Sequence, residues 1–274
     1  MFLSVIIPAY NEEKNIEKTV RSVFSYLTEK NIEHEIIVVT DGSKDKTNDI
    51  VRSLISEMPT LQLLDYEINR GKGYAVKQGM SKASGDLRLF TDADNSTPIR
   101  HLEIFFPYIN SAPSSSATEI LGRLKHAPPS DRHSEKGRAW GGAGEGFSVV
   151  IGSIAIAGHK VAIGSEPAWR RIFGKLGNLF IQIMAVPGIH DTQRGFKLFT
   201  AEAAEKIFPK LTIERWGFDV EVLALARKFG FKIKEVPVDW KNAPESHVGL
   251  KAYFQVLMET VKIRWNLISG RYEM

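Results

Sequence analysis

Four short apolar runs, each followed by a helical pattern, occupy about the first hundred residues and restrict the possible folds more than any other feature. All four are bounded by turn residues, as strands are, and the first two are also rich in β-branched residues. They cover residues 3–8, 35–40, 61–66 and 86–91. Strands that alternate with helices of about 10–15 residues predict βαβ units. We therefore expect an α/β fold in which helices flank a mostly parallel central sheet.

The pattern is less regular in the remaining chain. A helix is predicted over 99–109, and 110–147 is then rich in Ser, Pro, Gly and charged residues. A long segment without periodicity indicates a flexible loop or insertion, with a lid ordered by substrate as the alternative. Further helices are predicted at 167–185, 201–208, 220–229 and 246–270, and further strands at 148–154, at 231–238 and in a short run ending at 199. We expect one domain over 1–240 and an amphipathic helical extension over 241–274, packed on the domain or at a membrane interface.

Composition excludes several classes of protein. With 43% hydrophobic and 25% charged residues, the 274-residue chain resembles ordinary globular proteins. The formal net charge of +4 is too small to indicate a nucleic-acid partner. Cysteine is absent, which excludes disulfides, zinc–thiolate sites and a cysteine nucleophile. No apolar run predicts a spanning helix or a signal peptide, so we expect a cytoplasmic protein.

Polar residues follow the four early strands, at the sheet edge where such folds bind ligands. The loops concerned are 8–12, 41–43, 69–73 and 92–98. In the last of them Asp92 and Asp94 are separated only by Ala93. Alternating carboxylates after a strand can hold Mg²⁺ or Mn²⁺, which typically completes its shell with substrate phosphates. Alone this pattern also fits a solvated turn, and the convergence of four loops favours the metal site.

The neighbouring loops offer groups that suit a nucleotide. Lys72 lies in a glycine-flanked loop and could reach a diphosphate or a ribose. The loop at 8–12 offers an aromatic ring, a carboxylate and backbone groups, which suit a base and a ribose. Asp41 could accept a hydrogen bond from either. No Walker motif occurs, and no GxGxxG follows the first strand, which disfavours a P-loop NTPase and a dinucleotide-binding enzyme.

Six motifs in this order resemble a known family. They read SVIIPAYNEE, VVTDGSKDKT, NRGKGYAV, FTDADNSTP, DTQRGFKLF and ERWGFDVEVL. Together they resemble family 2 of the inverting glycosyltransferases, which have the nucleotide-sugar-binding GT-A fold. The C-terminal segment from Val236 is more similar to dolichyl-phosphate β-glucosyltransferases than to the mannosyl branch. The resemblance covers nearly the whole chain except 110–147.

The resemblance implies a role for each motif residue on the donor side. The nucleoside would contact Pro8, Ala9, Tyr10, Glu12 and Asp41. Asp92 and Asp94 would hold Mg²⁺ or Mn²⁺ on the donor diphosphate, where the metal assists departure of the nucleoside diphosphate. Lys72 and Ala93 would line the same nucleotide-sugar site. Glu12 could instead only complement a helix N-terminus, and Lys72 could be a solvated loop residue.

The resemblance also implies residues near the acceptor. Arg194 and Arg171 would contact donor or acceptor phosphate, because a planar guanidinium suits phosphate geometry. Arg171 could equally be an ordinary surface residue. Asp191 and Asp219 are the remaining candidate catalytic carboxylates near the reacting sugar, and we favour Asp191. Asp219 could instead cap the helix that follows it.

The expected reaction moves a hexose, glucose from UDP-glucose, onto a polyprenyl or dolichyl phosphate. A lipid phosphate is already anionic near neutral pH, so its attack needs positioning and charge neutralisation more than a base. A sugar hydroxyl would need a carboxylate base. The alternatives are transfer to a glycan hydroxyl, a nucleotide-sugar-binding protein that has lost catalysis, and a nucleotidyltransferase.

Two departures from the family affect the acceptor side. Relatives have arginine where this chain has Ile154, and that arginine is commonly assigned to phosphate contact. Relatives of the glucosyl branch usually carry an N-terminal membrane helix, whereas this sequence starts at its first predicted strand. We therefore expect a peripheral protein, with the helices at 167–185 and 246–270 at the membrane interface. The alternative is that both helices simply pack on the sheet.

Overall fold

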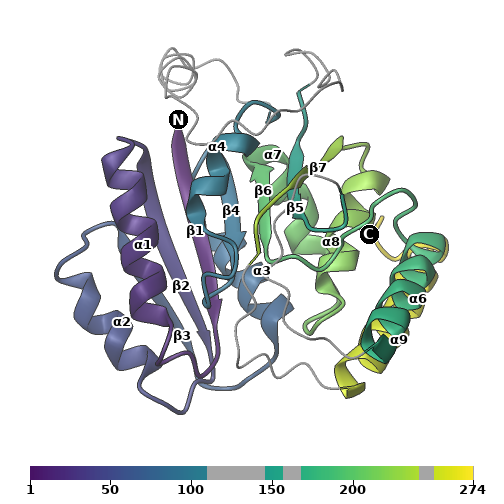
Figure 1. The fold of residues 1–274 in the computed structure, drawn as a ribbon, viewed down its shortest axis with the longest axis horizontal. Helices are drawn as coiled ribbons and strands as arrows, with labels where there is room; N and C mark the ends of the chain where they lie inside the picture. The colour runs from purple at the N-terminus through teal and green to yellow at the C-terminus, as the bar shows by residue number, and fades with distance from the viewer. Residues whose placement is uncertain (110–145, 157–167, 241–249, 274) are drawn as a thin grey trace.

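The computed structural model describes residues 1–109, 146–156, 168–240 and 250–273 (Figure 1). The predicted loop at 110–147 therefore lies almost entirely outside the described residues. Within them, seven strands form one sheet in the order β3-β2-β1-β4-β6-β5-β7. The strands are β1 (Phe2–Ala9), β2 (Glu33–Asp41), β3 (Leu61–Tyr66), β4 (Leu87–Thr91), β5 (Val149–Ser153), β6 (Phe196–Thr200) and β7 (Ile233–Pro237). Only β6 runs antiparallel to its neighbours in this sheet, which confirms the mostly parallel α/β fold.

Helices cover both faces of the sheet because its strands are apolar on both sides. One layer holds α1 (Ile16–Glu29), α2 (Thr47–Ile55) and α4 (Leu102–Phe105), and the other holds α3 (Lys72–Lys82), α7 (Ala201–Ile207) and α8 (Phe218–Lys228). Alternate side chains of β1 pack against the two helix layers, Val5 against the first and Ile6 against the second. Val5 lies in register with Ile36 of β2 and Leu89 of β4. The first hundred residues therefore form a rigid base for the loops at the strand ends.

Two longer helices lie side by side at one edge of the molecule (Figure 1). They are α6 (Ala168–Met184) and α9 (Leu250–Ile268). The buried side chains of α9 include Ile263, and the chain after it buries Tyr272. The predicted boundary between 1–240 and 241–274 stays a prediction. No helix in the described part of the chain combines the length and the apolar character needed to cross a bilayer.

The predicted helix over 99–109 was wrong in its extent. The structure has a 3-10 turn at Ile99–His101, followed by α4, which is capped by Phe106. Pro107 explains the early end, because proline lacks the backbone N–H that the next hydrogen bond of the helix would need. A second short 3-10 turn, Phe208–Lys210, follows α7. The other predicted elements are present with shifted ends.

A buried carboxylate in β2, Glu35, ties together three strands and a loop. One oxygen accepts hydrogen bonds from the Ser4 hydroxyl at 2.6 Å and from the Ser84 N–H and hydroxyl, both at 2.8 Å. The other accepts from the Gln62 amide at 2.9 Å. Burial would raise the pKa of Glu35, but these hydrogen bonds outweigh burial and lower the pKa below the ordinary 4.5.

The Glu35→Gln variant is expected to be less stable than the wild type by about 1–2 kcal/mol at neutral pH. Because the folded pKa is lowered, the ionised carboxylate stabilises the fold above pH 4.5, and this contribution is lost as the pH falls through the folded pKa. Urea unfolding at several pH values should therefore show the difference shrinking in acid. A difference that stays constant with pH would contradict this role for the charge.

Candidate active site

The predicted convergence of four loops at the carboxyl edge of the sheet is confirmed by direct hydrogen bonds. The Asn11 N–H donates to the Ser43 hydroxyl at 3.1 Å, and the Lys44 N–H donates back to Asn11 Oδ1 at 2.8 Å. The Glu12 N–H donates to the Thr47 hydroxyl at 2.8 Å. These contacts fix the loop after β1 against the loop after β2. Tyr10, in the first of these loops, is 49% exposed and leaves its ring accessible to a ligand.

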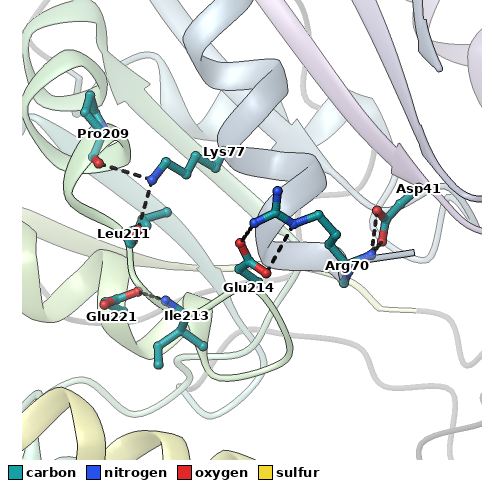
Figure 2. A network of polar contacts seen from close by, with 9 residues as sticks. Asp41, Arg70, Lys77, Pro209, Leu211, Ile213, Glu214 and Glu221 are labelled. Atoms are coloured by element: carbon teal, nitrogen blue, oxygen red, sulfur yellow. Dashed lines mark hydrogen bonds and ion pairs between the residues drawn. The ribbon is translucent and has the colours of Figure 1, made fainter. Parts of the chain in front are cut away.

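Asp41 joins the second loop to the third. Its buried carboxylate accepts from the Gly71 N–H at 2.6 Å and from the Arg70 N–H at 3.0 and 3.1 Å (Figure 2). Gly71 has φ of +123°, and a Cβ there would lie 2.5 Å from the Glu214 carbonyl oxygen, so only glycine fits. Asp41 thus orders the loop that leads into Lys72. Its predicted contact with a nucleoside stays a prediction.

Arg70 fastens the same loop to the segment before α8. Its guanidinium pairs with the Glu214 carboxylate (Figure 2). It also lies over the Tyr74 ring, 4.1 Å from the ring centroid. Glu221 in α8 holds that segment from within, since it accepts from the Ile213 N–H at 2.8 Å. Lys77 of α3 adds hydrogen bonds to the carbonyl oxygens of residues 209 and 211 (Figure 2). The loop at 69–73, α3 and the segment before α8 are therefore joined by hydrogen bonds and an ion pair.

The turn after β4 carries the predicted metal ligands. Lys72 Nζ lies 2.5 Å from Asp92 Oδ1, and Asp94 Oδ1 accepts the Ser96 N–H at 2.9 Å. Ala93 is buried, and its carbonyl accepts the Thr19 hydroxyl at 2.6 Å, which fixes the turn on α1. The structure thus brings Lys72, Asp92 and Asp94 together as the sequence predicts.

Three carboxylates crowd this turn. Burial raises the pKa of Asp94, and the charge of Asp92 raises it further. Burial also raises the pKa of Glu12, and the charges of both aspartates add to this effect against a hydrogen bond from Asn15. Crowded, half-buried carboxylates are the hard oxygen donors that suit Mg²⁺ or Mn²⁺. The residue types present therefore fit the predicted metal.

The protein groups alone do not complete a metal shell. Among the described residues, no three Asp, Glu, His or Cys side chains are arranged to hold an ion together. Magnesium and manganese commonly use one or two protein carboxylates and add phosphate oxygens. A metal on Asp92 and Asp94 would thus depend on a bound diphosphate.

A buried ion pair lies behind this turn. Lys197 of β6 is fully buried, with its Nζ 2.5 Å from Asp219 Oδ1 and 2.5 Å from the Arg194 carbonyl oxygen. Burial lowers the pKa of Lys197 and raises that of Asp219, although each charge opposes the shift of the other. Burial also opposes the charge of Lys72, but Asp92 and Asp219 outweigh burial and raise its pKa. Charges of alternating sign thus extend from Asp92 to Lys197.

Asp219 therefore does more than begin a helix. It lies in the first turn of α8, where no side-chain capping bond forms, and its carboxylate faces lysines from two other elements. Lys197 is not among the site residues predicted from the sequence. The available signal was a lysine within the apolar run FKLF, because a charge inside a buried strand needs a partner.

Replacing Lys197 by Met should destabilise the fold by about 3–5 kcal/mol, because the Asp219 carboxylate would stay buried without its partner. Urea unfolding measures the change. The double variant Lys197→Met/Asp219→Asn removes both charges and should recover part of the loss. A single variant within about 1 kcal/mol of the wild type would contradict the pairing.

Arg194 precedes Gly195, whose carbonyl contacts Asp92, and its side chain has two partners. Asp191 Oδ2 accepts Arg194 Nε at 3.0 Å and the Ile154 N–H at 3.0 Å. The Arg194 guanidinium lies over Trp240, 4.5 Å from the ring centroid. Asp191 thus orients Arg194 and, through the Ile154 N–H, also binds the backbone just after β5. Trp240 lies far from Arg194 in sequence, and no sequence pattern predicted that the two would be in contact.

The remaining predicted residues are placed as follows. Pro8 and Ala9 are buried at the end of β1, directly before the exposed ring of Tyr10. Arg171 falls in the first turn of α6, and its predicted phosphate contact lies outside the described side chains. The Asp92 N–H donates to the Gly195 carbonyl at 3.1 Å, which joins the carboxylate turn to the loop of Asp191 and Arg194.

Comparison with known proteins agrees with this arrangement. The family described as Glycosyl transferase family 2 matches residues 4–208. The chain is 32% identical to the dolichyl-phosphate beta-glucosyltransferase of Dictyostelium discoideum, over 100% of this chain and 77% of the relative. The enzymes of that name from Saccharomyces cerevisiae and Homo sapiens are 32% and 30% identical, over 99% of this chain and 77% and 78% of theirs.

Solved structures agree on the fold. Glucosyl-3-phosphoglycerate synthase from Mycobacterium tuberculosis, in complex with Mn²⁺, UDP and glucosyl-3-phosphoglycerate, has a TM-score of 0.59 at 18% identity. The match covers 96% of this chain and 79% of that one. The complex of that enzyme with Mg²⁺ and UDP has a TM-score of 0.60 at 19% identity, over 96% and 78%. The chain therefore belongs to glycosyl transferase family 2, has the GT-A fold, and is a glycosyltransferase similar along its length to dolichyl-phosphate β-glucosyltransferases.

Proposed function

We propose that this enzyme transfers glucose from UDP-glucose, with inversion, to a polyprenyl or dolichyl phosphate. The observation that carries the proposal is the hydrogen bond from the Asp92 N–H to the Gly195 carbonyl at 3.1 Å. It places the carboxylate turn directly beside the loop that holds Arg194. A diphosphate with its metal at this turn and a second phosphate at the Arg194 guanidinium would therefore lie next to each other, as a donor diphosphate and a phosphate acceptor require.

The choice of donor and acceptor is supported by the relatives. The names of the similar curated enzymes state a dolichyl phosphate and a glucosyl group. A solved structure of the mycobacterial synthase contains Mn²⁺, UDP-glucose and phosphoglyceric acid. We propose the same class of donor here.

On the donor side, Asp92 and Asp94 would hold Mg²⁺ or Mn²⁺, which stabilises the charge of the departing UDP. Lys72 keeps its positive charge beside Asp92 and would orient the diphosphate. Tyr10 offers its exposed ring to the nucleoside, with Pro8, Ala9 and Glu12 around it. Asp41 contributes by ordering the loop before Lys72.

On the acceptor side, Arg194 would bind the lipid phosphate, whose oxygen is already a nucleophile without proton removal. Asp191 uses one oxygen to hold Arg194 and the Ile154 N–H, which favours a positioning role over general-base catalysis. Asp219 would act through Lys197 and Lys72, as part of the charge network behind the diphosphate. A lipid-linked acceptor would bring the enzyme to the cytosolic membrane face as a peripheral protein.

One assay tests this proposal. The protein is incubated with Mn²⁺, a panel of nucleotide sugars and a short-chain polyprenyl phosphate in detergent, and nucleoside diphosphate release is followed. We expect release that needs both UDP-glucose and the lipid phosphate. Unphosphorylated polyprenol and free saccharides are the control acceptors. Release with a saccharide alone would replace the proposal by transfer to a glycan hydroxyl, and release with no acceptor would point to hydrolysis.

A further inference from the structure

Helices α6 and α9 pack against each other (Figure 1). Each carries an exposed apolar stripe. The stripe on α9 consists of Phe254, Met258, Val261, Trp265 and Ile268, and that on α6 of Leu176, Leu179 and Ile183. Spacings of three and four residues put each set on one side of its helix. Met258 and Trp265 are each 70% exposed. Single apolar side chains on a surface are ordinary, but continuous sets on adjoining helices indicate an interaction site. We call these two sets the outer stripes.

The other side of α9 already attaches the helix to the protein. Buried there are Val256, Thr260, Ile263 and Asn266. The Asn266 amide donates to the Thr212 hydroxyl at 3.1 Å, and the Glu259 carboxylate accepts the Gly217 N–H at 2.6 Å. A helix that is apolar on both sides is normally covered on both sides. The outer stripe of α9 stays exposed in the described part of the protein. We therefore expect a separate binding partner to cover it.

The charges beside the outer stripes are positive. Lys262 and Arg264 of α9 are exposed, and no ion pair joins either to a residue within the described ranges. The one acidic residue of α9, Glu259, is turned to Gly217. The sequence of α6 has three basic residues and no acidic one. A tryptophan-bearing apolar face beside unpaired cations suits an anionic lipid surface. It suits a second copy poorly, since two such faces would bring like charges together.

The helices that carry the outer stripes are connected to the candidate active site. α6 ends at Met184, shortly before the loop of Asp191 and Arg194. α9 holds Gly217, which directly precedes the turn of α8 that bears Asp219. A surface bound by α6 and α9 would therefore lie at a fixed position relative to the loops around Arg194 and Asp219.

We propose that the outer stripes of α6 and α9 form the face by which this enzyme docks on an anionic lipid surface. The apolar side chains enter the boundary between head groups and acyl chains, while Lys262 and Arg264 contact anionic head groups. Docking places the acceptor side of the site at the membrane. The identity of a lipid-linked acceptor rests on the proposed function, whereas the docking rests on the helices alone.

Vesicle flotation without substrates tests the docking. The full chain is mixed with vesicles of phosphatidylcholine, with or without phosphatidylserine. We expect the wild type to float with the anionic vesicles. The variant Phe254→Ser/Trp265→Ser should bind at least about tenfold more weakly, because two large apolar side chains no longer enter the interface. Lys262→Glu/Arg264→Glu should lose the preference for phosphatidylserine.

The matched control is Ile55→Ser, which removes an exposed isoleucine from α2 at the opposite edge of the sheet (Figure 1). It should float like the wild type. Thermal unfolding of each variant shows that the fold is intact. Flotation unaffected by Phe254→Ser/Trp265→Ser would overturn the proposal. So would a wild type that fails to float and instead dimerises through the same side chains in sedimentation velocity.

The two proposals fail separately. Flotation that depends on the outer stripes, from a protein that releases no UDP with any lipid phosphate, would support docking and overturn the proposed acceptor. Turnover of a detergent-dispersed acceptor by a wild type that does not float would support the proposed function and overturn docking.

Discussion

The Asp94→Asn variant is expected to lose metal-dependent glucose transfer by about a hundred- to a thousandfold. A bound cation contributes several kcal/mol of charge stabilisation, and each ~1.4 kcal/mol corresponds to a factor of ten in rate. The substitution is nearly isosteric, and the asparagine oxygen can still accept the Ser96 N–H that Asp94 accepts at 2.9 Å. The turn should keep its shape while losing a negative charge.

Stability should respond in the opposite direction from activity. Burial and the charge of Asp92 raise the pKa of Asp94, so its ionised form is disfavoured in the unliganded fold. Removing that charge should leave the thermal midpoint unchanged or higher. Initial rates of UDP release across a Mn²⁺ or Mg²⁺ titration, together with thermal unfolding, measure both effects.

Asp49→Asn is the matched control, because Asp49 is a solvent-exposed carboxylate on α2. It should keep wild-type rates and metal dependence. If Asp94→Asn retained both, the carboxylate turn would not be the metal site. If it lost activity only because it unfolds, the thermal midpoint would show that directly.

The Gly195→Ala variant is the second large effect that we expect. A Cβ at this position would lie 2.1 Å from the carboxyl atoms of Asp92, so the Asp92 side chain must move. That movement breaks the contact at 2.5 Å between Asp92 and Lys72 and disturbs the turn that presents Asp94. A displacement of about 1 Å in such groups costs about a hundredfold in rate, and we expect at least this loss in kcat/KM for the donor.

Gly177→Ala provides the control for a glycine substitution as such. A Cβ on Gly177 in α6 meets nothing within 4 Å, and alanine is favoured over glycine inside a helix by about 1 kcal/mol. This variant should keep its activity toward a detergent-dispersed acceptor. A Gly195→Ala enzyme with wild-type donor kinetics would show that Asp92 tolerates a different position, and would weaken its assignment as a ligand.

The part of the candidate site built by the loops after β1 to β4 could be predicted from sequence because each of its parts is local. β1 to β4 are short, largely apolar runs, and the residues that follow them reach the carboxyl edge through the parallel topology alone. Asp92, Asp94 and Lys72 therefore meet where the pattern of strands and loops predicts. The ends of the elements were harder to predict. The apolar periodicity continues past Pro107, although the proline has no N–H to extend the helix.

The network behind the site depends on contacts between segments far apart in sequence. Lys197 and Asp219 belong to a strand and a helix separated by α7, and a motif alone does not indicate that they are paired. The stacking of Trp240 on Arg194 likewise exists only in three dimensions. The sequence predicts that α6 and α9 have apolar faces. It does not show which apolar residues stay exposed, because that depends on how the helices pack.

The strand order has a consequence for how the chain assembles. β6 lies between β4 and β5, although β5 precedes it in sequence. During synthesis the first four strands can pair as soon as they appear, whereas β5 has no edge to join until β6 has been made. The outer edge of β4 stays open over that interval, and open edges invite pairing with other chains. The half of the sheet that carries Asp92 and Asp94 can thus form early, and completion of the other half waits for the strand that begins at Phe196.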